Sequence, residues 1–395
     1  MAQLDYLAFD ADNHYYEAVD AFTRHLDPKM AKRTMQWAEI DGKQRLLVAG
    51  RVNRFIPNPT FDPVARPGAL DEYFRGHKAG DDLRSAFGDL DPISPAYRNR
   101  DARLALMDDQ GIEGCFLFPT LGVGMEQALV HDPEAAHAAF HAFNEWLDED
   151  WGFNYRDRIF TAPYFTLLDP DRTVAEIDWA LGRGARVIVM RAGPVQTPGM
   201  FRSPGDPVYD PFWARINDAG ITVAYHSGES GYHRYAEEWG ESGEMEAFRQ
   251  NPFKTITSAD RPIYDLVTAL ICHGVLARHP NVRIATIESG SEWVPVLAKK
   301  MKKVYGQVPN AFPSGDPTET LRERVWVSPY YEDDLLELKD TLGSGNIIFG
   351  SDFPHAEGLA DPVAFAKELD GFTDDEIRLV MRENALGLSK PRLRT

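Results

Sequence analysis

Acidic and imidazole side chains follow three well-separated apolar segments of the sequence, in types and spacings suited to binding a metal ion. Asp12 and His14 stand two residues apart after the first segment, YLAFDADNH. Extended backbone turns side chains two apart to the same face, so this pair can reach one cation. His226 ends a second apolar run, ITVAYH, and Asp352 ends a third, NIIFGSD. Two carboxylates and two imidazoles form a ligand set for one divalent ion, zinc first, with manganese or iron as alternatives.

Each of these residues also has a plain structural interpretation. A His after a strand is often a hydrogen-bonded structural residue, and an Asp before Phe-Pro is often a turn former. The metal interpretation therefore depends on whether the fold brings the four residues together.

Short apolar runs alternate with helical patterns along most of the chain, which predicts parallel strands joined by crossover helices. The runs lack polar alternation, as expected of strands covered on both faces. They cover residues 6–12, 113–119, 158–167, 185–191, 221–226, 282–288, 324–328 and 346–352. Eight strands make a (β/α)8 TIM barrel, in which all the candidate ligands would lie at the catalytic, carboxyl end.

The helical patterns cover residues 101–109, 133–151, 171–181, 211–219 and 373–386. In the last of these, Thr373 and Glu376 have the spacing of a capping box.

The sequence predicts one domain over residues 1–395 with two insertions. Residues 36–100 hold many Pro, Gly, Asp and Arg, and residues 229–260 are polar and broken by glycine. Both follow a predicted strand, at the end where barrel enzymes keep their sites. We expect lids or oligomer contacts, and the alternative is a pair of surface loops without a role in the site.

Composition excludes several classes of partner. The 395 residues are 43% hydrophobic and 26% charged, with a formal net charge of -19. So acidic a surface repels phosphate backbones, so a nucleic-acid partner is not expected. No stretch approaches the roughly 18 apolar residues of a membrane span, and the first residues do not have a signal-peptide pattern. The two cysteines, Cys115 and Cys272, fit a reducing compartment, and we expect a cytoplasmic protein.

The chain resembles the amidohydrolase superfamily, in the branch of aminocarboxymuconate-semialdehyde decarboxylase. The resemblance covers nearly the whole chain and rests on DADNH, AYHSG, GVLARHPNVRIATIESGSEWVP, IIFGSDFPHAEG and RENALGL. It implies that Asp12 and His14 replace the family's H-x-H or E-x-H pair, and that His226 is the ligand from the fifth strand. It implies that Asp352 touches the metal and exchanges a proton with the activated water. It also implies a small-molecule substrate and a homodimer.

One position departs from the family pattern. The related decarboxylases use a His in an H-G-G element on the sixth strand, where this chain has Glu288-Ser289-Gly290. A carboxylate can act as a second base or orient a ligand, but it cannot replace a cationic imidazole beside an anionic substrate. We therefore expect a hydrolase of a small carbonyl- or carboxylate-bearing substrate, with non-oxidative decarboxylation as the alternative. An inactive binding protein is a third reading.

Further residues are candidates for the substrate pocket. Arg191 ends the fourth strand and either clamps a substrate carboxylate or pairs with a barrel acid. His355, with its neighbour Glu357, either orients Asp352 and lines the pocket or forms a surface turn. Trp293 and Tyr330 supply apolar walls or simply pack, and His273 is either structural or pocket-lining.

The sequence favours neither a second metal site on a helix nor a pair of metal ions. His137 and His141, in HAAFH, lack the Glu of the H-E-x-x-H protease motif and lie on a predicted outer helix. The Lys after the fourth strand that could form a carbamate bridge between two metals is absent. Because Arg191 cannot take that role, we expect a single metal ion.

Overall fold

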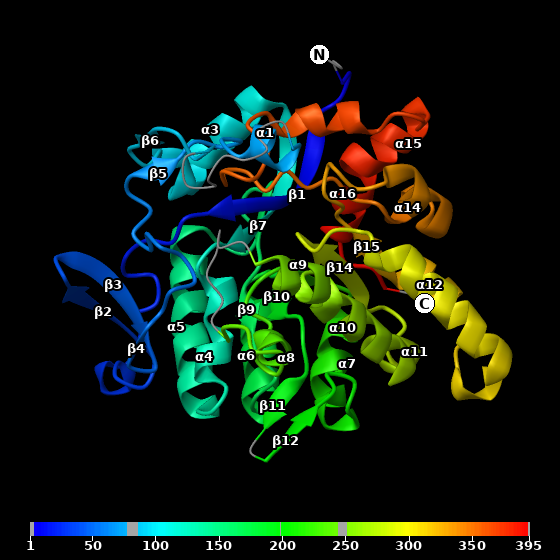
Figure 1. Cartoon of the computed structure of the whole chain (residues 1–395), viewed down its shortest axis with the longest axis horizontal. Coiled ribbons are helices and arrows are strands. Elements are labelled where there is room, and N and C mark those ends of the chain that lie inside the picture. Colours follow the sequence, from blue (N-terminus) through cyan, green and yellow to red (C-terminus); the bar gives the residue numbers. More distant parts are fainter. Residues whose placement is uncertain (1–3, 77–85, 198, 244–250, 394–395) are drawn as a thin grey trace.

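The structure is a computed structural model that describes residues 4–76, 86–197, 199–243 and 251–393. Strands and helices alternate along the chain, with the parallel strands at the centre and helices outside them (Figure 1). The fold is therefore mixed α/β with parallel sheets, as the sequence predicts. The parallel strands are β1 (Ala8–Tyr15), β7 (Ile112–Pro119), β8 (Ile159–Thr161), β9 (Tyr164–Phe165), β10 (Val187–Arg191), β13 (Thr222–His226), β14 (Arg283–Ile287) and β15 (Val325–Val327).

The parallel strands form two sheets that meet at one short segment. The first sheet has the order β1-β7-β8 and the second has the order β15-β14-β13-β10-β9. The predicted strand at 158–167 is present as the two short strands β8 and β9, which belong to different sheets. Between them, the amide of Ala162 donates to Leu117, and the Pro163 carbonyl accepts from Val189. This segment thus joins the two sheets.

The predicted eighth strand is not a regular strand. Residues 346–352 make only isolated parallel bridges, Ile347 with Val327 and, just beyond, Phe353 with Asn13. The amide of Ser351 donates to the side chain of Asp10 instead of to a neighbouring strand, which interrupts the ladder. The segment nevertheless lies between β15 and β1, because it is hydrogen-bonded to both of them.

Each crossover between parallel strands contains at least one helix. The helices in these connections include α3 (Arg100–Gln110), α5 (Pro133–Asp150), α6 (Pro170–Gly182), α7 (Asp210–Ala219), α10 (Arg261–Cys272), α11 (Val275–Arg278), α12 (Trp293–Gln307), α13 (Pro317–Arg324) and α14 (Leu335–Leu342). The C-terminal region is helical without a break over 374–388, close to the prediction of one helix over 373–386, but it contains a π-helical turn that was not predicted. It consists of α15 (Asp374–Arg378), the π-helical turn (Leu379–Glu383) and α16 (Asn384–Leu388), and the predicted capping box of Thr373 and Glu376 is present.

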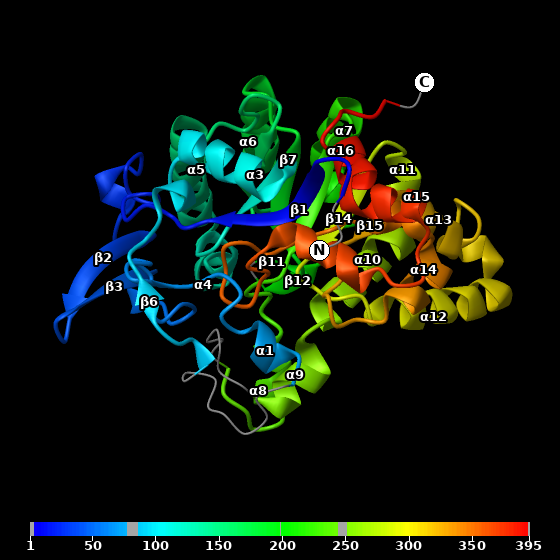
Figure 2. The same cartoon turned by 90° about the horizontal axis from the view of Figure 1, so that it is seen from above.

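The segment from 36 to 100 contains small antiparallel sheets, a short α-helix and a 3-10 helix (Pro95–Tyr97), apart from residues 77–85, which lie outside the described ranges. Its strands and the α-helix are β2 (Met35–Ile40), β3 (Lys43–Val48), β4 (Arg51–Val52), β5 (Val64–Ala65), α1 (Asp71–Phe74) and β6 (Leu90–Asp91). The β2–β3 turn has positive φ at both Asp41 and Gly42, as a two-residue Asp-Gly hairpin requires. The β2–β4 sheet projects from one side of the molecule in both views (Figures 1 and 2).

The segment from 229 to 260 holds α8 (His233–Glu237) and α9 (Pro252–Ser258), and its residues 244–250 are outside the described ranges. A further hairpin, β11 (Val195–Thr197) with β12 (Met200–Arg202), follows β10. None of the helices in the described ranges combines the length and apolar character needed to cross a membrane.

Candidate functional site

The end of β1 supplies two of the predicted ligands. β1 pairs with β7, but its register shifts by one residue between Asp10 and Asn13, which marks a bulge. The side chains of Asp12 and His14 still converge, with His14 Nε2 3.3 Å from Asp12 Oδ1. Both are buried, at 3% and 1% exposure. The carboxyl group of Asp10 points elsewhere and accepts hydrogen bonds from Asn13 and Ser351.

His226 reaches the same point from the end of β13. Its Nε2 atom lies 3.1 Å from Nε2 of His14 and 3.5 Å from Oδ1 of Asp12. Its Nδ1 atom is 2.7 Å from the carbonyl oxygen of Ser227. A carbonyl can only accept, so Nδ1 carries the hydrogen and Nε2 of a neutral His226 presents a lone pair to the cluster.

Asp352 completes the predicted set from the loop that follows Ile347. Its Oδ1 atom lies 3.3 Å from His14 Nε2 and 2.6 Å from Nδ1 of His355. Asp352 has φ of 54°, an uncommon conformation for a non-glycine residue that turns its side chain toward β1. Of the four residues named from the sequence, Asp12, His14 and His226 belong to one group of potential ligands, whereas Asp352 contacts His14 and belongs to a neighbouring group with His14 and His355.

Glu288 also belongs to this cluster. Its Oε2 atom lies 3.2 Å from Nε2 of His226, and its backbone also has positive φ, at 49°. Glu288 follows β14, the neighbour of β13, so strand pairing places it beside His226. Ligand-type atoms of Asp12, His14, His226 and Glu288 all lie within 4.8 Å of one another.

These separations can be compared with those in a metal centre. Donor atoms that share an ion at about 2.1 Å lie roughly 3.0–3.5 Å apart. The contacts between these atoms within the cluster range from 3.1 Å to 3.5 Å. In addition, Asp12 Oδ1 is buried and has no hydrogen-bond partner among the described residues. The residues present therefore fit a divalent cation.

Burial shifts the pKa values of two carboxyl groups in the cluster, those of Asp352 and Glu288. It raises the pKa of Asp352 well above its usual range, and the charge of Glu357 adds to that effect. It also raises the pKa of Glu288, with the charge of Asp352 adding to the effect. These carboxyls repel one another in a poorly solvated site, and a cation between them would relieve the repulsion.

The pKa values of His14 and Asp12, which are more deeply buried, are lowered instead. Burial lowers the pKa of His14, and the neighbouring His355 lowers it further, so the His14 ring is neutral. For Asp12, burial opposes ionisation, but the adjacent rings of His14 and His226 outweigh it and hold the pKa low. An ionised Asp12 beside a neutral His14 is the protonation state that a metal requires of its ligands.

A buried hydrogen-bonded frame fixes these ligands from behind. Arg103, which is fully buried on α3, donates to the carbonyl of His14 at 2.7 Å and to the side chain of Asn13. Asn13 in turn donates to Asp10, whose carboxyl also accepts from the amide of Ser351 at 3.0 Å. The frame ties β1 to the loop that carries Asp352.

A second support holds Asp352 through His355. Thr120, which follows β7, donates its hydroxyl to the carbonyl of Tyr15 at 2.8 Å. Its oxygen is therefore left to accept from Nε2 of His355, 3.0 Å away. Thr120 thereby sets the orientation of the ring, with Nδ1 of His355 toward Asp352.

A family model described as amidohydrolase matches residues 90–388 of this chain. The chain belongs to the amidohydrolase family. An amidohydrolase from Mycobacterium avium subsp. paratuberculosis K-10 has 47% sequence identity and a TM-score of 0.92, covering 98% of this chain and 100% of that chain. No curated protein matches the sequence.

Two more distant solved structures share the fold of the present chain. A dihydroxybenzoic acid decarboxylase from Polaromonas sp. JS666, with bound manganese and 2-nitroresorcinol, has 16% identity and a TM-score of 0.57, over 81% of this chain and 93% of that chain. A 5-carboxyvanillate decarboxylase from Novosphingobium aromaticivorans, complexed with manganese, has 15% identity and a TM-score of 0.60, over 98% of this chain and 96% of that chain. At these identities the likeness concerns the fold alone.

In the amidohydrolase described here, Arg191 lies on the wall of a hollow beside His226. Its Nη1 donates to Gln127 at 2.9 Å and to the carbonyl of Ser230 at 2.8 Å, and its Nη2 donates to the carbonyl of Pro194 at 2.7 Å. Its Nε lies 3.6 Å from Oε1 of Glu126. These contacts favour the salt-bridge alternative over a substrate clamp. The hollow is lined by Val123, Tyr164, Met190, Arg191, Ala192, His226, Ser227, Gly228, Ser230, Ala259, Pro262, Ile263 and Ser289.

The remaining predicted pocket residues lie at different distances from the cluster. Tyr330 is close, because its hydroxyl donates to the carbonyl of Glu288 at 2.8 Å. Trp293 is buried, at 1% exposure, and its indole N–H donates to Gly290. His355 contacts Asp352 directly, as one of its two predicted alternatives requires. The roles of Tyr330 and Trp293 in substrate binding stay predictions.

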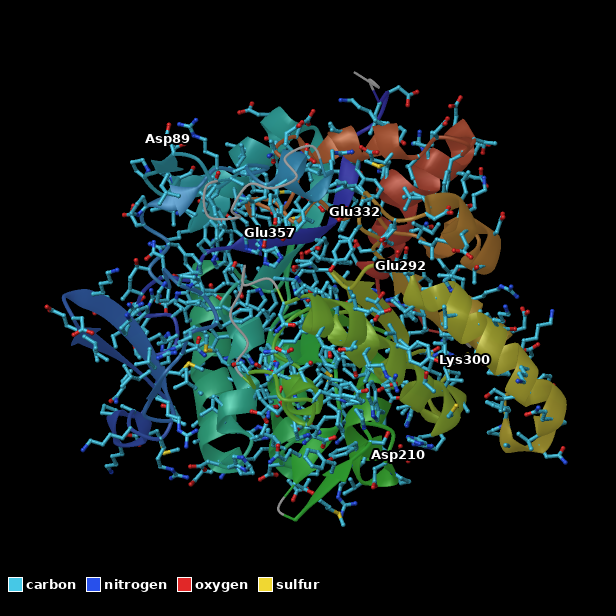
Figure 3. The ribbon with its side chains drawn as sticks, viewed as in Figure 1. Asp89, Asp210, Glu292, Lys300, Glu332 and Glu357 are labelled. Carbon is cyan, nitrogen blue, oxygen red and sulfur yellow. The ribbon has the colours of Figure 1, made fainter. Side chains whose placement is uncertain are left out.

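His273 is not part of the cluster. It ends α10, where its Nδ1 is 2.6 Å from the hydroxyl of Ser203 and its carbonyl accepts from Arg278. Arg278 pairs with Asp210, which Figure 3 shows near α7, well separated from Glu357 beside β1. These contacts favour the structural alternative for His273.

Sequence reasoning did not single out several polar residues around the site. Thr120 and Arg103 hold His355 and His14, and the carboxyl of Glu17 accepts from the amides of Leu121 and Gly122. Their only signal in the sequence is position, because Thr120 follows a predicted strand and Glu17 comes three residues after His14. Glu288 was recognised as a possible base, but its place beside His226 required the pairing of β13 with β14.

Proposed function

We propose that this protein is a metal-dependent hydrolase that acts on a small carbonyl-bearing substrate. The proposed substrate class includes aromatic compounds. The carrying observation is the convergence of His14, His226, Asp12 and Asp352, with the two Nε2 atoms 3.1 Å apart. As metal ligands the two imidazoles would be neutral, and a cation between their Nε2 atoms would bind both lone pairs. Burial lowers the pKa of His226, but Glu288 and Asp12 outweigh it and raise that pKa, so this position favours positive charge. Membership of the amidohydrolase family supports the same proposal.

We propose a single divalent ion held by Asp12, His14, His226 and Asp352, with Glu288 next to it. Zinc is our first choice, and the manganese in related structures supports manganese as the alternative, followed by iron. When bound, such an ion lowers the pKa of a coordinated water toward about 7 and polarises a carbonyl. Nitrogen and oxygen ligands accommodate each of these metals.

The residues of this chain would move the protons. Asp352 is placed to accept a proton from the attacking water and to return it to the leaving group. His355 holds the Asp352 carboxyl at 2.6 Å, and Thr120 holds His355. Glu288, 24% exposed at the side chain, would serve as a second base or orient His226.

The surrounding architecture is proposed to be a single closed (β/α)8 barrel. The hydrogen bonds of segment 159–165 and of residues 347–353, which join the two sheets on either side, support closure. We propose that residues 36–100 and 229–260 are insertions over its carboxyl end. A cytoplasmic homodimer stays a prediction.

Non-oxidative decarboxylation is the second candidate. Several proteins that share the fold are decarboxylases of aromatic acids, which favours this reaction. Glu288 at the place of the family's sixth-strand His argues against it, because a carboxylate repels an anionic substrate.

Two measurements test the proposal. Metal analysis of the protein purified without chelators is expected to give about one equivalent of zinc, manganese or iron, and less than about a tenth of an equivalent would favour an inactive binding protein. Assays with aryl esters, lactones and amides are then compared with assays for bicarbonate release from aromatic carboxylic acids. Bicarbonate without hydrolysis would replace the proposed reaction by decarboxylation.

A further inference from the structure

A buried carboxyl lies behind the only guanidinium in the hollow beside His226. Glu126, on α4 (Glu126–Leu129), is 4% exposed, and its Oε1 is 3.6 Å from Nε of Arg191. Its oxygens also accept from the hydroxyl of Tyr164 at 3.0 Å and from that of Thr166 at 2.8 Å. Both hydroxyls donate to the carboxyl group, so each of its oxygens acts as an acceptor.

The charge of Arg191 is therefore cancelled at short range. Its side chain is only 7% exposed, so water screens the pair weakly. Of the described residues that line the hollow, Arg191 and His226 alone can be cationic, and His226 faces Asp12 and Glu288. On the loop that follows His226, His233 pairs with the carboxyl group of Glu229. This pair therefore brings no uncompensated positive charge to the hollow.

The rest of the hollow carries no charged side chain and combines apolar residues with the hydroxyl groups of Tyr164, Ser227, Ser230 and Ser289. Its wall includes Val123, Met190, Ala192, Pro262 and Ile263. An apolar ring or alkyl chain suits these side chains, whereas a carboxylate entering here would lose hydration without meeting a net positive charge. The carboxylates on the far side of His226 would repel it as well.

We propose that Glu126 is a specificity-determining residue that makes this site select uncharged substrates over anionic ones by neutralising Arg191. The inference rests on the proposed function and names the substrate class for it. On this inference, the arginine at the end of β10 does not make the site a carboxylate receptor.

The test compares two probes of the same shape, benzamide and benzoate, in calorimetric or NMR titrations of the metal-free protein. Removing the metal prevents benzoate from coordinating it. The wild type is expected to bind benzamide more tightly than benzoate. Glu126→Gln keeps acceptor oxygen for Thr166 but exposes the charge of Arg191, so benzoate binding is expected to strengthen by about tenfold relative to benzamide.

Two variants control for trivial effects of charge or packing. Glu229→Gln makes the same change of charge on the neighbouring loop and is expected to leave the benzoate-to-benzamide ratio within about twofold of the wild type. The double variant Glu126→Gln/Arg191→Gln removes both charges and is expected to restore the wild-type ratio. An unchanged ratio in Glu126→Gln, or no binding of either probe, would overturn the proposal.

The same variants are then assayed, metal-loaded, with phenyl acetate and its ring-carboxylated analogue. If neither ester is hydrolysed by the wild type, the proposed function fails, while the titrations still decide the role of Glu126. If both are hydrolysed, the carboxylated ester is expected to gain on the neutral one in Glu126→Gln.

Discussion

Two groups of acidic and histidine side chains lie at opposite ends of β14, and they differ in their partners. His279 precedes the strand and contacts Asp210 at 3.3 Å, while Arg278 binds the same carboxyl at 2.8 Å. Glu288 follows the strand and faces His226 in the candidate metal cluster. Among the described residues, the carboxyl groups of that cluster have no ion pair with Lys or Arg.

The comparison shows what separates a structural group from a site made of the same residue types. At the amino end of β14 an arginine neutralises the carboxyl, and the group is complete without a ligand. At the carboxyl end, imidazoles face each other and Asp12 keeps an unpartnered buried oxygen. Buried polar groups are normally satisfied, so this unpartnered oxygen supports the proposed cation site.

The largest expected effect is the loss of the imidazole of His226, beside the carboxyl end of β14. The matched control removes the imidazole of His279, at the amino end of the same strand. His226→Ala is expected to lose bound metal, to below about a tenth of an equivalent, and to lose activity by at least about a thousandfold. His279→Ala, a buried His of the other group, is expected to retain both. Metal analysis and steady-state kinetics on the two variants measure this difference, and equal metal loss in both would end the comparison.

Asp352→Asn is expected to preserve the metal but lower kcat by about a hundredfold to ten-thousandfold. The amide keeps an oxygen toward His14 but cannot accept a proton. Metal content and kcat are measured on the same preparation. Near-native turnover would show that Asp352 is not the base.

Glu288→Gln should have an intermediate effect. If Glu288 orients His226 from outside the ligand set, its loss is expected to reduce activity or metal affinity by about tenfold to a hundredfold. Competition with a chelating indicator separates affinity from turnover. A loss of metal as complete as that in His226→Ala would make Glu288 a ligand in its own right.

A smaller effect is expected at Thr120, which supports the cluster indirectly. Thr120→Val removes the acceptor for His355, and kcat is expected to fall by about tenfold with KM nearly unchanged. Thr120→Ser, which keeps the hydroxyl, should restore kcat. A KM effect, or no rescue by serine, would assign Thr120 to packing.

The smallest expected effect concerns stability. Burial raises the pKa of Glu17 from 4.5 to about 7, against the hydrogen bonds from Gly122 and Leu121. A raised pKa means that the folded state holds the proton more tightly. The contribution is therefore fully present below about pH 4.5 and is lost as the pH rises through 7, by at most about 1.4 kcal/mol per pH unit.

Glu17→Gln removes this titration. Urea unfolding of the metal-free protein between pH 4.5 and 8 is expected to show a shallower pH dependence in the variant than in the wild type. Parallel curves would show that Glu17 does not titrate in this range.

The sequence by itself determined the alternation of strands and helices and the four ligand candidates. Apolar runs without polar alternation indicate strands covered on both faces, and parallel strands collect the residues after them at one end. That rule was sufficient to predict that His226 and Asp352 lie at the same end of the sheets, although Asp352 follows a segment that is not a regular strand.

Only the tertiary structure decided which charges meet. The pairing of β13 with β14 sets Glu288 against His226, and the fold brings Glu126 to Arg191 over 65 positions of sequence. A sequence pattern gives the direction of a side chain on its own strand, whereas neutralisation depends on distances of a few ångströms between strands. For that reason, the sequence alone could not choose between a clamp and a salt bridge for Arg191.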